Sequence, residues 1–240
     1  MEPRDAGPGA RTPRVRPGSA AARTGRDHAG FSPSSLAGFV AEFMDALGIE
    51  RAPVVGNSLG GLVSLRLALS RPSRVSALGL VDSAGLGREV TPRSPRRRSP
   101  ASVRRLSSGR RPRRRGSAVP GEGPAPLRRP HLGPAEWLAE QARLGLSNGF
   151  METTLAALRS HIGPAGQKGS EILLDELPRL EMPTLVVWGA LDKVVPLRHA
   201  HDAVARLRHG NLEILPGCGH LPHVECPGRF AEVLNRFLDG

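Results

Sequence analysis

The feature that most constrains the fold of this chain is an alternation of short apolar runs with helix-like segments. Residues 34–47 place apolar side chains at i, i+3, i+4 and i+7, the spacing of one helix face, with Ser34 or Ser35 as the expected N-cap. A second helix is expected at 60–69. This alternation is typical of parallel strands covered by helices, so it predicts an α/β fold with a parallel sheet of about four strands and flanking helices. The expected strands are 52–55, 75–81, 184–188 and 212–215.

Two Arg-rich segments, one before the alternation and one within it, carry the positive charge of the chain. The 240 residues hold 34 Lys and Arg against 22 Asp and Glu, a net charge of +12. Residues 88–130 alone hold 14 Arg and 2 acidic residues, together with many Pro, Ser and Gly. This composition cannot bury enough apolar surface to offset the entropy of ordering. Residues 1–30 and 88–130 are therefore predicted to be disordered.

Composition alone does not decide whether the segment 88–130 is genuine coding sequence. Nearly all basic residues of the chain are Arg, a bias that GC-rich coding DNA produces, and out-of-frame reading of such DNA yields mainly Arg, Pro, Gly, Ala and Ser. The segment is either a genuine linker or sequence from a shifted frame. The expected division of the chain is 1–30 disordered, 31–87 the first part of an α/β core, 88–130 low-complexity, 131–180 a small helical insertion and 181–240 the second part of the core.

Composition and motifs also exclude several classes of protein. No apolar run reaches about 18 residues and no apolar stretch follows the basic N-terminus, so neither a transmembrane helix nor a secretory signal is expected. We therefore expect a cytoplasmic protein in which Cys218 and Cys226 are reduced, with Cys218 a packed thiol. The Arg clusters lack interleaved aromatic residues, so no specific nucleic-acid partner is expected. No phosphate-binding loop or dinucleotide fingerprint is present, and the histidines lack metal-ligand spacing, so neither cofactor nor metal is expected.

A G-x-S-x-G pattern at 56–60 supplies the first candidate catalytic residue. Ser58 follows an apolar strand and opens a helix, a turn that projects the serine hydroxyl from the carboxyl edge of a sheet. The Leu59 backbone N–H, at the start of that helix, would stabilise an oxyanion. Gly56 and Gly60 are expected to let neighbouring elements pack closely. The same pattern at 145–149 follows a helix instead, so Ser147 is assigned to a helix–helix turn.

A base and an acid for this serine follow two later strands. Because a free hydroxyl is a poor nucleophile, Ser58 needs a base, and His220 lies in a Gly-rich loop just after the strand at 212–215. Asp192 follows the strand at 184–188 and is the candidate to orient the imidazole. The carboxyl ends of parallel strands meet at one edge of a sheet, so the three side chains are expected to converge there. The chain order Ser, Asp, His is the one known for α/β-hydrolases.

On these residues the chain resembles the α/β-hydrolase family. The motifs that carry the resemblance are Val54-Val55-Gly56-Asn57-Ser58-Leu59-Gly60-Gly61, Trp188-Gly189-Ala190-Leu191-Asp192, and Gly217-Cys218-Gly219-His220. The resemblance implies Ser58 as nucleophile, His220 as general base and acid, and Asp192 as its orienting acid. It also implies a small-molecule substrate and a helical cap within 131–180.

The resemblance narrows the class of reaction. A serine nucleophile argues against the epoxide hydrolases and haloalkane dehalogenases, which use an aspartate. An asparagine directly before the nucleophile, as Asn57 is here, resembles the motif of the carbon–carbon bond hydrolases of ring-cleavage products, and many esterases share it. The expected substrate is therefore an ester or a similar small acyl or carbon–carbon compound.

The chain departs from the family in what precedes the helix at 34–47. The four expected strands match the second half of the family's sheet, and no His-Gly pair upstream of Ser58 supplies the second oxyanion donor. The strand at 52–55 would then lie unpaired at the edge of the sheet. The alternative interpretation is therefore a hydrolase-fold remnant without activity of its own. Composition leaves the oligomeric state open.

Overall fold

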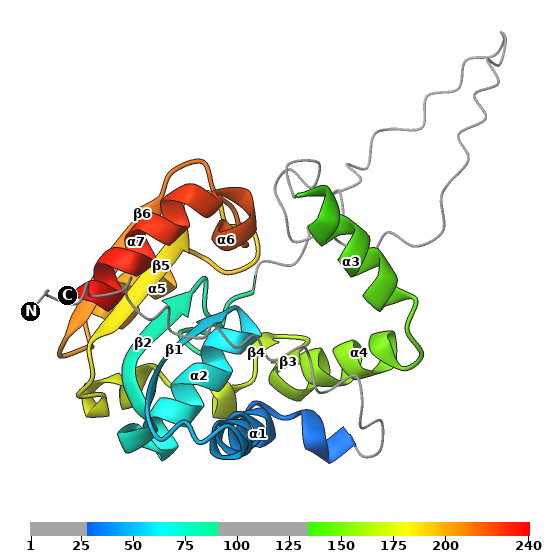
Figure 1. The fold of residues 1–240 in the computed structure, drawn as a ribbon, viewed down its shortest axis with the longest axis horizontal. Coiled ribbons are helices and arrows are strands. Elements are labelled where there is room, and N and C mark those ends of the chain that lie inside the picture. The colour runs from blue at the N-terminus through cyan, green and yellow to red at the C-terminus, as the bar shows by residue number, and fades with distance from the viewer. Residues whose placement is uncertain (1–27, 91–133) are drawn as a thin grey trace, which may run out of the picture.

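The computed structural model describes residues 28–90 and 134–240 (Figure 1). The predicted disordered segments, 1–30 and 88–130, lie almost wholly outside the described residues. Residues 88–90 of the second segment are described, and Arg88 and Glu89 contact the domain. The Arg88 carbonyl accepts a hydrogen bond from the Gln167 N–H at 2.8 Å, and the Glu89 carboxylate lies 2.8 Å from Nε2 of His199.

A four-stranded parallel sheet forms the centre of the fold, which confirms the predicted α/β class. Its order across the sheet is β1-β2-β5-β6, and every neighbouring pair is parallel. The two outer strands each run two residues longer than predicted, β1 at its carboxyl end and β6 at its amino end. The strands are β1 (Ala52–Asn57), β2 (Val75–Val81), β5 (Thr184–Gly189) and β6 (Gly210–Leu215).

Helices cover both faces of this sheet (Figure 1). On one face α2 packs on β1 and β2, α5 packs on β5 and β6, and α1 packs on α2, while α7 packs on β6 from the other face. A hydrophobic core lies on each face of the sheet, and successive strand residues point into opposite cores. Trp188 packs in the core beneath α5, and Val187 packs in the core beneath α7. The helices are α1 (Pro33–Ala46), α2 (Leu59–Ser70), α5 (Arg198–Val204), α6 (Pro222–Glu225) and α7 (Pro227–Asp239).

The N-cap of α1 is Ser32, so the expectation of Ser34 or Ser35 is wrong. The Ser32 hydroxyl accepts a hydrogen bond from the Ser35 N–H at 3.1 Å. Pro33 is the first helical residue, a position that suits proline because its missing N–H would have no partner within the helix. The cap of the helix therefore lies two or three residues earlier than its apolar periodicity indicates.

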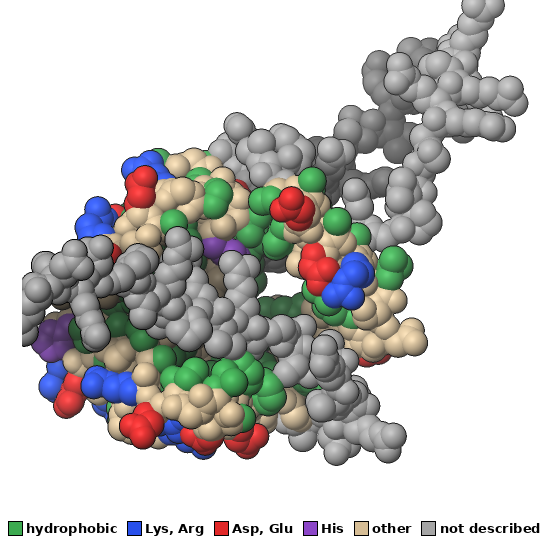
Figure 2. Space-filling model, viewed as in Figure 1, with side chains coloured by type: hydrophobic (Ala, Val, Ile, Leu, Met, Phe, Trp, Pro, Cys, Tyr) green, Lys and Arg blue, Asp and Glu red, His purple; other side chains and the backbone are tan. Residues whose placement is uncertain are grey.

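The segment between β2 and β5 contains α3 (Ala135–Gly145) and α4 (Phe150–His161). Ser147 lies between these two helices, as predicted. None of the α3 residues is buried, and apolar side chains are exposed on and just after this helix, with Leu138 at 37% and the C-cap residue Leu146 at 86% exposure (Figure 2). A hairpin of β3 (Ile162–Gly163) and β4 (Gly166–Gln167) follows, and a 3-10 helix, Leu174–Arg179, returns the chain to the core.

No helix within residues 28–90 and 134–240 combines the length and the apolar character that crossing a membrane requires.

The crossing of β1 and α2 depends on a glycine. A methyl group added at Gly56 would overlap the carbonyl oxygen of Gly60, so the strand and the helix approach as closely as they do only because Gly56 has no side chain. Gly60 itself faces open space, which contradicts the expectation that it permits close packing. Gly61 has that role instead, because a methyl group there would overlap the Ser83 hydroxyl.

We expect Gly56→Ala to destabilise the fold and Gly60→Ala to leave its stability nearly unchanged. The methyl group of Gly56→Ala must push α2 away from β1, so the free energy of unfolding should fall by about 1–3 kcal/mol or more. Gly60→Ala adds its methyl group in open space at the start of a helix and should stay within about 0.5 kcal/mol of the wild type. Urea denaturation of both variants measures the difference; equal stabilities would contradict the packing argument.

Candidate active site

Ser58 occupies a strained turn between β1 and α2. Its φ of 54° and ψ of −119° lie in a region that non-glycine residues rarely adopt, at a cost of about 1–3 kcal/mol. Two of its backbone hydrogen bonds tie it to β2 and the residues that follow: the Ser58 N–H donates to the Val81 carbonyl at 2.9 Å, and the Ser58 carbonyl accepts from the Ala84 N–H at 3.0 Å. Leu59 is the first residue of α2, so its N–H has no acceptor within the helix and is free to meet a developing negative charge.

Asp192 and His220 form the pair that the sequence predicts. The Nδ1 atom of His220 lies 2.9 Å from Oδ2 of Asp192, with both side chains almost fully buried. The other oxygen of Asp192 accepts from the backbone N–H groups of Val194 at 2.6 Å and Val195 at 3.2 Å. An ionised carboxylate only accepts hydrogen bonds, so Nδ1 carries the imidazole proton and Nε2 is left as an acceptor.

The Asn57 side chain joins the serine turn to the histidine loop. Its Nδ2 donates to the His220 carbonyl at 3.0 Å and to the Val81 carbonyl at 3.1 Å. Ser58 and the Asp192–His220 pair are therefore held at one edge of the sheet by a residue next to the serine. Within the described residues the Ser58 hydroxyl makes no hydrogen bond to His220, so direct Ser–His contact remains a prediction.

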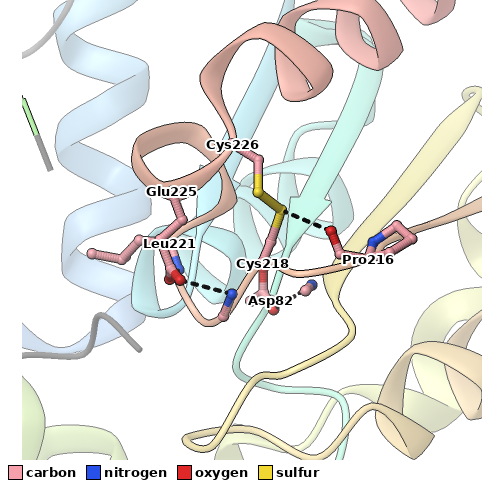
Figure 3. The surroundings of a disulfide bond; sticks show 8 residues. Asp82, Pro216, Cys218, Leu221, Glu225 and Cys226 are labelled. Carbon is pink, nitrogen blue, oxygen red and sulfur yellow. Dashed lines mark hydrogen bonds between the residues drawn. A yellow bond between two sulfur atoms is a disulfide. The ribbon is translucent and has the colours of Figure 1, made fainter. Parts of the chain in front are cut away.

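The loop that carries His220 is closed by a disulfide between Cys218 and Cys226 (Figure 3). The expectation of reduced thiols is therefore wrong, although Cys218 is fully buried in the core as expected. The short helix α6 turns the chain back on itself and brings the two Cα atoms to 6.1 Å. Spacing along the sequence could not show this return. The cytoplasmic location stays a prediction.

The carboxylate of Glu225 holds the same loop from inside. Its two oxygens accept from the backbone N–H groups of Gly219 at 2.9 Å and Leu221 at 3.1 Å, one on each side of the histidine (Figure 3). These are charge-assisted bonds to otherwise unpaired donors, so they fix the backbone on which His220 sits.

Asp82 is a member of the site that the sequence analysis missed. It directly follows β2, has a φ of 43° and is fully buried. Ligand atoms of Asp82, Asp192 and His220 all lie within 4.8 Å of one another. Burial, and then the nearby charge of Asp192, raise the pKa of the Asp82 carboxyl well above its usual range. An acid directly after a predicted strand, at the edge where the other two candidates lie, was the signal available in the sequence.

These three side chains are also the one group within residues 28–90 and 134–240 whose atoms are close enough to share a metal ion. A metal ion there would have to displace the hydrogen bond between Nδ1 of His220 and Oδ2 of Asp192. The donor set therefore suits the acid–base pair better than a metal, and we assign no metal to it.

Comparison with known proteins places these features in one family. The chain is 30% identical over 236 residues to an uncharacterised protein of Mycobacterium tuberculosis, covering 89% of this chain and 63% of that protein. It is 29% identical over 206 residues to a 2-hydroxymuconate semialdehyde hydrolase of Pseudomonas putida, covering 81% and 65% respectively. The chain thus spans less than two thirds of the length of these curated relatives.

Solved structures show the same fold. A meta-cleavage product hydrolase from Pseudomonas fluorescens is 24% identical with a TM-score of 0.60, covering 87% of this chain and 72% of that one. A bacterial membrane phospholipase A is 27% identical with a TM-score of 0.61, covering 88% and 64% respectively. The family model described as "Alpha/beta hydrolase family" matches residues 8–233. Since this match takes in most of the chain, the protein belongs to the α/β-hydrolase family.

Proposed function

We propose that this protein is a serine hydrolase in which Ser58 is the nucleophile, His220 the general base and acid, and Asp192 the residue that orients the imidazole. The observation that carries the proposal is the buried 2.9 Å contact between Asp192 and His220, beside a serine in a strained strand–helix turn. Nucleophilic catalysis needs this combination, because the serine must be exposed on a rigid turn and its base must keep one tautomer.

The reaction proceeds in two halves. The Ser58 hydroxyl attacks the substrate carbonyl while Nε2 of His220 takes its proton, and the Leu59 N–H stabilises the oxyanion. Collapse of this intermediate expels the leaving group, which receives the proton from Nε2. Water then attacks the acyl-enzyme by the same route and releases Ser58. Asp192 stabilises the imidazolium throughout and keeps its own charge. No cofactor is needed for any step.

The substrate we propose is a small ester or a related acyl or carbon–carbon compound. Relatives at about 30% identity are named a putative carbamate hydrolase in Caulobacter, 32% identical, and a 2-hydroxymuconate semialdehyde hydrolase in Pseudomonas putida, 29% identical. Both names denote hydrolases, and hydrolysis at a carbonyl carbon is the chemistry that a serine nucleophile and an oxyanion donor supply. The hydrogen bonds that Asn57 makes to the Val81 and His220 carbonyls give this residue a structural role at the site.

A protein of this fold without activity is the second candidate. The observation that favours it is the position of β1, which among the described strands pairs with β2 alone and forms the edge of the sheet. Val55 on this strand is 39% exposed. Residues 28–90 and 134–240 also contain no counterpart of the family's loop with the second oxyanion donor. Loss of one such donor costs about 10²–10³ in rate.

Labelling by a fluorophosphonate probe separates the two candidates. We expect Ser58 of the full 240-residue chain to be labelled, slowly because Leu59 is its one identified oxyanion donor. Ser58→Ala should abolish labelling, and His220→Ala should lose nearly as much because the members of a triad act as a unit. Mass spectrometry of the labelled peptide measures the site.

The matched control is Ser147→Ala, which removes the serine of the second G-x-S-x-G pattern, in the turn between α3 and α4. This variant should label at the wild-type rate. No labelling of the wild-type chain would favour the inactive candidate, and labelling that survives Ser58→Ala would contradict Ser58 as the nucleophile.

Removing the disulfide should weaken both the fold and the site. In Cys218→Ala/Cys226→Ala the loop around His220 keeps the Glu225 bonds but loses its covalent closure. We expect thermal stability to fall by about 2–4 kcal/mol, and labelling of Ser58 to slow in parallel. Calorimetry and labelling of the wild type with and without a reductant test the same point: reduction should reproduce the double variant and leave the double variant unchanged.

A further inference from the structure

We propose that Asp82 is a neutral carboxylic acid that donates its proton in a hydrogen bond to the Asp192 carboxylate, and that it thereby acts as a positioning residue for the Asp192–His220 pair. This inference rests on the proposed function, because it assigns a role within the same site. It begins from a buried polar atom that the triad alone leaves unexplained.

That atom is Oδ2 of Asp82, which is buried and has no hydrogen-bond partner among the described residues. The other oxygen, Oδ1, accepts from the Gly189 N–H at 3.0 Å (Figure 3). A buried oxygen without a partner costs about 1–3 kcal/mol if it stays unpaired. If Oδ2 carries a proton, it becomes a donor instead, and the nearby acceptor is Asp192, which has a carboxylate oxygen within 4.8 Å of a carboxyl oxygen of Asp82.

The hydrogen bonds around the two carboxyls decide which one holds the proton. Asp192 accepts from two backbone N–H groups and from His220, three donors that all stabilise a negative charge. Asp82 accepts from one N–H and is fully buried. Two like charges at this separation disfavour each other, so the carboxyl with less support keeps the proton. The raised pKa of Asp82 agrees with this assignment.

The other charged groups that face Asp82 strengthen the same conclusion. Glu225, from the histidine loop, adds a second negative charge nearby and raises the pKa of Asp82 further. The one group of the site that can become positive is His220, and its Nδ1 is already bonded to Asp192. No cation among the groups that act on Asp82 therefore favours its ionised form.

The position of Asp82 in the backbone explains how it can align the site. Its own N–H donates to the Val187 carbonyl of β5, while Val81 and Ala84 on either side bond to Ser58. A hydrogen bond from Asp82 to Asp192 would thus link the loop of the acid to the segment that holds the nucleophile. The same hydrogen bond would delocalise part of the negative charge of Asp192. The carboxylate would then stabilise the imidazolium form of His220 less strongly relative to the neutral imidazole.

Infrared spectroscopy tests the proton directly and does not depend on activity. At pH 7 the wild-type chain and Ser58→Ala should both show the carbonyl stretch of a buried protonated carboxylic acid, shifted in D₂O. Asp82→Asn should lack it. Absence of this band from the wild type at pH 7 would overturn the proposal, whatever the labelling of Ser58 shows.

Two substitutions separate the proton from the backbone conformation. Asp82→Gly accepts the φ of 43° but removes the carboxyl, whereas Asp82→Asn keeps a neutral donor of the same shape and tolerates the positive φ. We expect Asp82→Gly to slow labelling of Ser58 by about 10- to 100-fold, because the acid–base pair is misplaced. Asp82→Asn should label Ser58 at close to the wild-type rate, because it keeps most of the positioning that Asp82→Gly loses. If Asp82→Asn labels as slowly as Asp82→Gly, the carboxyl acts as a charge and the proposal is wrong.

The pH profile distinguishes positioning from a merely structural role. Labelling needs neutral His220, so its rate rises with pH as the imidazole loses its proton. In Asp82→Gly the unshared charge of Asp192 holds that proton more tightly, and the rising limb should move to higher pH. In Asp82→Asn it should stay at the wild-type position. A profile that is scaled down in Asp82→Gly without moving would indicate structural damage alone and contradict the proposal.

The dependence of the melting temperature on pH tests the protonation of Asp82 without relying on any catalytic activity. The folded chain keeps the Asp82 proton that the unfolded chain releases above about pH 4, so Asp82 lowers stability increasingly as pH rises from there towards its folded pKa. Asp82→Asn removes this dependence, so its melting temperature should exceed that of the wild type by a margin that grows with pH. A margin independent of pH would mean that Asp82 is ionised in the folded protein.

Discussion

The short stretch of backbone at the carboxyl end of β2 is the constraint on which the site depends. The Val81 carbonyl accepts the Ser58 N–H, the Ala84 N–H donates to the Ser58 carbonyl, and the Asp82 N–H donates to Val187. One segment thus holds the nucleophile turn on one side and the strand before Asp192 on the other. The strain at Ser58 persists because these bonds over-determine its backbone.

Packing around this segment leaves little freedom. A methyl group at Gly189 would overlap the Gly219 carbonyl, so the end of β5 lies directly against the loop that carries His220. The loop is held in turn by the carboxylate of Glu225 and by the disulfide of Cys218 with Cys226. Each side chain of the proposed triad is therefore supported by backbone hydrogen bonds or close packing, which is what precise alignment of a nucleophile and its base would require.

Much of this arrangement could be predicted because its signals are local. Apolar runs mark the four strands, and an acid or a histidine soon after a strand marks the edge where parallel strands end. The pairing of Cys218 with Cys226 has the opposite character, because only the reversal of the chain at α6 brings the two residues together. Two other features had local signals that apolar periodicity does not use. Pro33 marks the first turn of α1 and so makes Ser32 its cap, and Asp82 directly follows β2.

The sequence by itself determined the class of fold, the strand–turn–helix at Ser58 and the order of Ser58, Asp192 and His220, because each follows from periodicity and spacing along the chain. Tertiary structure alone decided which groups lie close together in space and which cysteines form a bond. Asp82 lies 110 residues from Asp192 along the chain, and only the pairing of β2 with β5 brings the two carboxyls together. Hydrogen bonds and charge interactions act over a few ångströms in space, and the number of residues between two groups does not reveal how far apart they lie in the folded chain.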